Sequence, residues 1–163
     1  MTTKRNQQIV LIKVEDKPGV LSKISSLCRR RRYNIKSLTV GTTDKKGLSQ
    51  ITLVFSKEEE RIQNIANQID KLIEVIEVEV VNPRNVIDKE VILLIAKNGR
   101  LEEYIFKKST SYDINVRTIN EIQGNPVYEI LGEGGAIELF LDGIDLKNDV
   151  VKMVRSGLIA LKI

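Results

Sequence analysis

Residues 8–28 read QIVLIKVEDKPGVLSKISSLC and contain the signals of a strand, a turn and a helix in direct succession. Residues 8–15 carry apolar side chains on both faces, which predicts a central strand that is covered on both sides. In the turn that follows, we expect Asp16 to cap a helix and Pro18 to lie in its first turn. Apolar residues then recur at helical spacing, at Val20, Leu21, Ile24, Leu27 and Cys28.

The same kinds of element continue along the chain. Strands are predicted at residues 34–42 and 47–56, and the polar, glycine-containing connection between them fits a hairpin. A second helix is predicted from Lys57, with Glu58 to Glu60 in its first turn. Its apolar residues follow a 3-4 repeat at Ile62, Ile65, Ala66, Ile69, Leu72 and Ile73. A half-exposed fourth strand alternates Ile76, Val78 and Val80 with Glu77 and Glu79. The resulting β-α-β-β-α-β order is that of the ferredoxin-like fold.

Asn82-Pro83-Arg84-Asn85 breaks this pattern and is the expected linker between two domains. Beyond it the elements repeat in a shortened form: a strand at 91–96, a helix at 99–109, a strand pair at 113–119 and 126–131, a helix at 134–144, and one or two short strands within 150–162. We therefore predict an α+β protein with two ferredoxin-like βαββαβ domains, residues 1–81 and 86–163, joined by residues 82–85.

The composition excludes several classes of site. The chain of 163 residues has no His, which removes imidazole bases, Ser-His and Cys-His nucleophile pairs, and His metal ligands. Its single cysteine, Cys28, cannot form an internal disulfide or a cysteine zinc site, and its place on the apolar stripe predicts a core residue. The stretch Gly132-Glu133-Gly134-Gly135 lacks the Gly-Lys-Ser/Thr ending of a phosphate loop and is expected to be a strand-to-helix turn. We predict no catalytic residue and no metal site on this chain.

The net charge of +4 comes largely from one run, Arg29 to Arg32. The helix dipole favours cations at the end of a helix, so a solvent-exposed helix end is the expected role of this run. An acidic protein partner and nucleic acid are the alternatives, although few aromatic residues are available for a nucleic-acid surface. The absence of an 18-residue apolar run and of a signal-peptide pattern, together with a lone thiol, predicts a cytoplasmic protein.

The turn from Asp16 to Leu21 is the most informative candidate site. A helix N-terminus offers unpaired amides and a positive dipole to a carboxylate, and Gly19 leaves room for a ligand. Asp16 could hold an ammonium group, while Val20 and Leu21 could line an apolar pocket. These residues fit either a site for an apolar amino acid or an ordinary capped helix.

Residues 14–55 resemble the N-terminal ACT domain of the small, or regulatory, subunits of acetolactate synthase (acetohydroxyacid synthase). Asp16-Lys17-Pro18-Gly19 matches the D-x-P-G turn of ACT domains, whereas NIKSLTVG at 34–41 followed by GLSQIT at 47–52 is specific to this family. The resemblance continues more weakly to VVKMVRSGLIAL at 150–161, which is similar to the family's closing R-[ST]-G-x-x-A motif. It implies an N-terminal ACT domain and a shorter, divergent ACT-like C-terminal domain.

The resemblance also implies a function. Members of this family catalyse nothing alone and bind no thiamine. They join a catalytic subunit that depends on thiamine diphosphate and magnesium, raise its activity and confer feedback inhibition, usually by valine, in the route to valine, leucine and isoleucine. ACT domains pair side by side, so this chain is expected to form a homodimer. The effector pocket would comprise Asp16, Gly19, Val20 and Leu21 of one chain with Asn34 and Ile35 of its partner. Neither nucleic acid nor a membrane is an expected partner.

Two residues depart from the family pattern. Asp16 stands where members commonly have Asn, and Arg32 stands where Gly is usual; a left-handed φ at Arg32 would cost about 1 kcal/mol. The sequence does not identify the effector among branched-chain amino acids, because one methylene changes affinity by only about 1–3 kcal/mol. An alternative function is a free-standing ACT-domain amino-acid sensor that regulates another enzyme or a transcription complex. Co-purification with a thiamine-dependent partner distinguishes the two functions.

Overall fold

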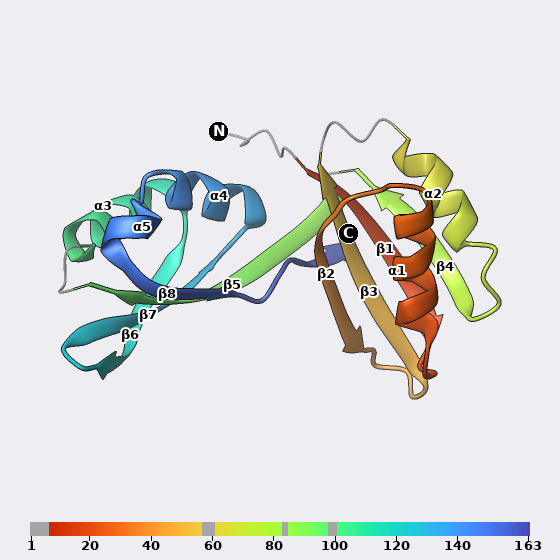
Figure 1. Cartoon of the computed structure of the whole chain (residues 1–163), viewed down its shortest axis with the longest axis horizontal. Helices are drawn as coiled ribbons and strands as arrows, with labels where there is room; N and C mark the ends of the chain where they lie inside the picture. Colours follow the sequence, from red (N-terminus) through yellow and green to blue (C-terminus); the bar gives the residue numbers. More distant parts are fainter. Residues whose placement is uncertain (1–6, 57–60, 83–84, 98–100) are drawn as a thin grey trace. The chain divides into compact units, whose positions relative to one another are not determined.

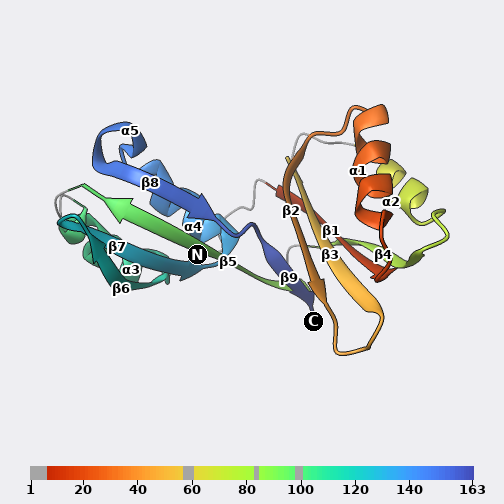
Figure 2. The ribbon, with the colours of Figure 1, turned by 60° about the horizontal axis from the view of Figure 1, so that its bottom comes forward.

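The computed structural model describes residues 7–56, 61–82, 85–97 and 101–163 (Figures 1 and 2). The first elements are β1 (Gln7–Glu15), α1 (Val20–Arg30), β2 (Ile35–Thr42), β3 (Leu48–Ser56), α2 (Ile62–Ile69) and β4 (Val75–Val81). The four strands form one antiparallel sheet in the order β2-β3-β1-β4. This is the predicted ferredoxin-like arrangement, and both helices lie on one face of the sheet (Figure 1).

Strand β1 is covered on both faces, as its apolar pattern predicts. Val10, Ile12 and Val14 pack in the core between the sheet and the two helices. Ile9 and Leu11, which point to the opposite face, belong to a second apolar cluster. All five side chains are buried. The outer face of this sheet is therefore covered as well as the helix face.

The remaining elements repeat the arrangement. They are β5 (Val86–Ala96), α3 (Glu102–Tyr112), β6 (Asn115–Ile122), β7 (Asn125–Gly132), α4 (Gly134–Asp142), α5 (Leu146–Asp149), β8 (Val150–Arg155) and β9 (Ile159–Lys162). The second sheet has the order β6-β7-β5-β8, and β9 pairs with β5. Its helix-facing core includes Ile92, Leu94, Ile105, Ile130 and Phe140. The predicted duplication of the βαββαβ unit is confirmed.

The chain divides into two compact units. Among the described residues, the first unit comprises 7–87 together with 158–163, and the second comprises 88–157. The predicted C-terminal domain, residues 86–163, includes the last six residues of the chain. The two divisions therefore differ in where the end of the chain packs.

The apolar outer face of the first sheet explains this difference. Leu158 and Ala160, on either side of Ile159, are buried in one cluster with Ile9, Leu11 and Val54. An apolar sheet face is unfavourable in water, and the last residues of the chain cover this one. The chain thus returns to its first unit after it has completed the second.

Two predicted details of the first unit are wrong. Helix α2 ends at Ile69, so Leu72 and Ile73 lie beyond it, and Ile73 is 95% exposed. The register of β4 against β1 shifts between Lys13 and Val14, and Ile76 is the extra residue at this bulge. The side chain of Ile76 is exposed for this reason, instead of facing the core. The predicted first turn with Glu58 to Glu60 lies outside the described residues.

Candidate functional site

The turn between β1 and α1 presents a helix N-terminus that no side chain caps. Gly19 is the N-cap residue, with φ 89° and ψ −12°. The predicted capping by Asp16 is wrong because Asp16 lies three residues before the N-cap, and Pro18 precedes the N-cap instead of lying in the first turn. The backbone holds the turn, since the Asp16 amide donates to the Gly47 carbonyl at 2.8 Å. A Cβ on Gly19 would meet no atom within 4 Å, so the space beside Gly19 at the start of the helix is open.

The side chains of this turn differ in what they can contact. Asp16 is exposed, and Leu21 is 40% exposed on the first turn of α1. Val20, in contrast, is 3% exposed and packs in the core under the helix. A ligand at this turn would therefore meet the side chains of Asp16 and Leu21, but not that of Val20.

Asp16 offers an available carboxylate beside the helix N-terminus. Its side chain has no hydrogen bond or ion pair within the described residues. The neighbouring charges are paired: Lys17 contacts Glu15 at 2.7 Å, and Lys23 pairs with Glu74. The hydrogen bond from Lys23 lowers the pKa of Glu74, and the hydrogen bond to Glu15 raises the pKa of Lys17. The amides at the helix N-terminus can bind the carboxylate group of an amino acid, and the Asp16 carboxylate can bind its ammonium group.

Asn34 and Ile35 lie where α1 ends and β2 begins. The helix ends in a Schellman motif, in which the Tyr33 amide donates to the Cys28 carbonyl at 3.0 Å. Arg32 has φ 60°, so the left-handed conformation considered at this position is present. The chain leaves the motif with Asn34 exposed and Ile35 half-buried.

One chain does not bring the six predicted pocket residues together. Ile35 and Gln8 both align with Phe55, so β2 begins at the end of the sheet where β1 begins. The turn that contains Asp16 and Gly19 follows the opposite end of β1. Helix α1, with eleven residues, separates the two groups by about 16 Å. A pocket that uses both groups needs a second copy of the chain.

The arginine run lies at the exposed end of α1, as predicted. Arg29 and Arg30 are in the last turn of the helix, and all four side chains from Arg29 to Arg32 are exposed. Cys28, directly before the run, is 1% exposed, and burial raises the pKa of its thiol to about 11. Cys28 is therefore the core residue that its position on the apolar stripe predicts.

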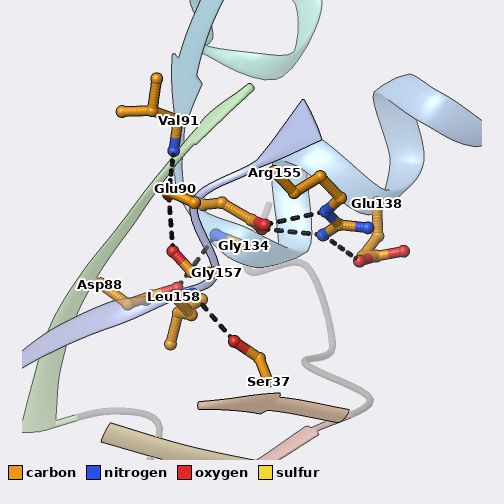
Figure 3. A network of polar contacts seen from close by, with 10 residues as sticks. Ser37, Asp88, Glu90, Val91, Gly134, Glu138, Arg155, Gly157 and Leu158 are labelled. Atoms are coloured by element: carbon orange, nitrogen blue, oxygen red, sulfur yellow. Dashed lines mark hydrogen bonds and ion pairs between the residues drawn. The ribbon is translucent and has the colours of Figure 1, made fainter. Parts of the chain in front are cut away.

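The glycine-rich stretch of the second unit is a strand-to-helix turn, as predicted. Gly132 ends β7, and Glu133 is the N-cap residue of α4. The Gly134 amide donates to the carboxylate of Asp88 at 3.0 Å, and Asp88 is 1% exposed (Figure 3). This buried carboxylate occupies the helix N-terminus where a phosphate would bind, so the stretch is not a phosphate site.

A groove that the sequence did not indicate lies on the outer face of the first sheet. It has a volume of about 320 Å³, and β2, β3, the turn after β2 and β9 form its walls. Its polar lining consists of Thr39, Thr42, Thr43, Asp44, Gln50 and Thr52. None of the six predicted pocket residues lines it. In the part of the chain that the structure describes, no group of three or more Cys, Asp or Glu side chains is placed to hold a metal ion, and no helix is long and apolar enough to cross a membrane.

Comparison with known proteins relates this chain to one family. A family model for the AHAS small subunit-like ACT domain matches residues 10–77. A probable acetolactate synthase small subunit of Archaeoglobus fulgidus is 30% identical over 159 residues, which cover 93% of this chain and 94% of that protein. The acetolactate synthase small subunit of Mycolicibacterium smegmatis is 44% identical over 81 residues, or 50% of this chain and 48% of that protein. The crystal structure of the acetolactate synthase small subunit from Thermotoga maritima superimposes with a TM-score of 0.79 at 27% identity, over 98% of both chains.

Proposed function

This chain belongs to the acetolactate synthase small-subunit family, and we propose that it activates a catalytic subunit of acetolactate synthase and makes it sensitive to valine. Similarity over both units supports this proposal, because the Archaeoglobus relative and the Thermotoga structure match nearly the whole chain. Thiamine diphosphate and magnesium would be held by the catalytic subunit. This chain, which has no His, would contribute regulation and no catalytic residue.

The accessible N-terminus of α1 is the observation that supports an effector site at this turn. The first amides of the helix would bind the carboxylate of valine, and Gly19 leaves that approach free. Asp16 would accept hydrogen bonds from the ammonium group, and Leu21 would contact the apolar side chain. Asn34 and Ile35 of a second copy would close the pocket, so the proposal includes a homodimer through the first units.

A pair of substitutions at Gly19 tests the site. Gly19 has a left-handed φ, so any side chain is strained there, but Gly19→Asp and Gly19→Asn share that strain and nearly the same shape. Two carboxylates about 4 Å apart repel by about 4 kcal/mol at an effective dielectric constant of 20. Half of that energy corresponds to an affinity loss of about thirtyfold. We expect Gly19→Asp to bind valine about thirtyfold more weakly than Gly19→Asn in calorimetric titration.

The reconstituted complex provides the second measurement. Both variants should still raise the activity of the catalytic subunit, because this proposal places the contacts for activation away from the turn. Valine should inhibit the complex with Gly19→Asn and not the complex with Gly19→Asp. Equal valine sensitivity of the two folded variants would contradict an effector site at this turn.

A further inference from the structure

Two hydroxyl groups of β2 hold one residue near the end of the chain. The Ser37 hydroxyl accepts a hydrogen bond from the Leu158 amide at 3.2 Å, and the Thr39 hydroxyl donates to the Leu158 carbonyl at 2.8 Å. Figure 3 shows the contact with Ser37. Leu158 is 3% exposed, so both of its backbone polar groups are satisfied by side chains of a single strand. Gln50 of β3 adds a hydrogen bond to the Ala160 carbonyl at 3.2 Å.

The residues directly before Leu158 are fixed within the second unit. Arg155 pairs with Glu90 at 2.8 Å and with Glu138 at 2.6 Å (Figure 3). The Ser156 amide donates to the Val91 carbonyl at 2.9 Å, and its hydroxyl accepts from the Val91 amide at 3.0 Å. Gly157 follows with φ 78°. Arg155 and Ser156 are thus held by residues of the second unit, and Leu158, two residues after Ser156, is held by residues of the first.

Strand β2 also carries the residues proposed to touch the effector. Asn34 directly precedes the strand, Ile35 is its first residue, and Ser37 follows Ile35 by two positions. The pairing of β2 with β3 shifts register between Ile35 and Ser37. A bulge at this place sets the direction of the side chains that follow it. The position of Ile35 is therefore linked through the backbone to the direction of the Ser37 hydroxyl, two positions along, and of the Thr39 hydroxyl, four positions along.

We propose that Ser37 and Thr39 are positioning residues of the regulation, which couple effector binding at the start of β2 to the segment 158–163. An effector that fixes Asn34 and Ile35 would fix the bulge and both hydroxyls, and would thereby tighten the hold on Leu158. The coupling is reciprocal, so release of the segment weakens effector binding by the same factor. This inference rests on the proposed function and describes how effector binding at that site acts on the segment 158–163.

Inhibition of the reconstituted complex at saturating valine tests the coupling. The double variant Ser37→Ala, Thr39→Val removes both hydroxyls, and loss of each hydrogen bond of ordinary strength raises the released population about fivefold. We expect the double variant to activate the catalytic subunit normally and to lose most of the valine inhibition. Thr42→Val is the matched control, because Thr42 is an exposed threonine of the same strand whose hydroxyl has no hydrogen bond within the described residues. The conservative variant Thr39→Ser, which keeps a hydroxyl, should retain inhibition.

Hydrogen exchange, measured on the wild-type chain and on the double variant, gives a second test that does not depend on the catalytic subunit. Valine should slow the exchange of the amides in residues 158–163, and this slowing should be absent from the double variant. A purely structural role would give faster exchange in the double variant with an unchanged effect of valine, and that result would overturn the inference. Full inhibition of the double variant at saturating valine would overturn it as well. If valine neither binds nor inhibits the wild type, the proposed function fails and the inference fails with it.

Discussion

Left-handed backbone conformations stand at both ends of α1, at Gly19 with φ 89° and at Arg32 with φ 60°. Glycine adopts this conformation without a penalty, whereas an L side chain at such a position costs about 1 kcal/mol. Arg32 makes the Schellman contacts of the helix end in spite of this cost, since its amide donates to the Arg29 carbonyl at 3.0 Å. The strain therefore belongs to one residue and can be removed without changing the motif.

Arg32→Gly should raise the free energy of unfolding by about 0.5–1 kcal/mol, because it relieves this strain. Arg31→Gly is the matched control: Arg31 has φ −93°, so glycine there only adds entropy to the unfolded chain and should lower stability. Urea unfolding of both variants measures the two shifts. Destabilisation by both substitutions would show that the φ of Arg32 carries no strain.

Cys28 makes stability depend on pH in the alkaline range. Its thiol pKa is raised to about 11 in the folded chain by burial, so the folded state holds the proton more tightly than the unfolded state does. Stability is unaffected below the ordinary thiol pKa and falls as the pH rises from there towards 11, by up to about 1.4 kcal/mol per pH unit. Cys28→Ala should remove this part of the pH dependence. Parallel stability curves of wild type and variant between pH 8 and 10.5 would contradict the assignment.

At the scale of elements, the last segment of the chain, residues 158–163, stabilises the first unit through one of its two faces. Leu158, just before the strand, is 3% exposed in the cluster with Ile9 and Leu11, whereas Leu161 is 63% exposed. Leu158→Ala should lower the free energy of unfolding by about 2–3 kcal/mol. Leu161→Ala makes the same chemical change on the exposed face and should cost less than about 0.5 kcal/mol. Equal costs in urea unfolding would mean that the segment does not pack on the sheet in solution.

Local periodicity predicts the elements of the first unit closely, since the strand expected at 34–42 is Ile35–Thr42 and the one expected at 47–56 is Leu48–Ser56. It fails where the outcome depends on distant contacts. Apolar residues continue past the end of α2 to Ile73, but the helix ends at Ile69 and the Ile73 side chain is exposed. The apolar run around Ala160 predicts a strand. It does not predict which sheet this strand covers, because any exposed apolar face could bind it.

The same limit applies to the candidate site. The D-x-P-G pattern identifies the turn, and its residues lie where a ligand could reach the helix N-terminus. The sequence did not predict that Gly19, and not Asp16, is the N-cap residue, because a short polar side chain before a helix usually favours capping. Nor did it indicate the contacts of Ser37 and Thr39 with Leu158, which join residues more than a hundred positions apart.

At the scale of the whole molecule, the proposed pocket requires an assembly. The turn and the start of β2 lie at opposite ends of α1, so neither end of one chain contains a complete set of the proposed residues. A two-fold axis relating two first units would place the turn of each chain against the β2 start of the other. Such a dimer contains two equivalent pockets, each of which depends on residues from both chains.

Complementation between two variants tests this shared pocket. In a heterodimer of a Gly19→Asp chain and an Asn34→Asp chain, one pocket carries both substitutions and the other carries neither. Random pairing of co-expressed chains makes about half of the dimers heterodimers, so about a quarter of all pockets should regain wild-type affinity for valine. Calorimetric titration counts these sites, with each variant alone as the control that should have none. A pocket contained in a single chain would give no recovery, because every chain in the mixture carries a substitution. Recovery of about a quarter of the sites therefore requires that the two groups meet across the dimer.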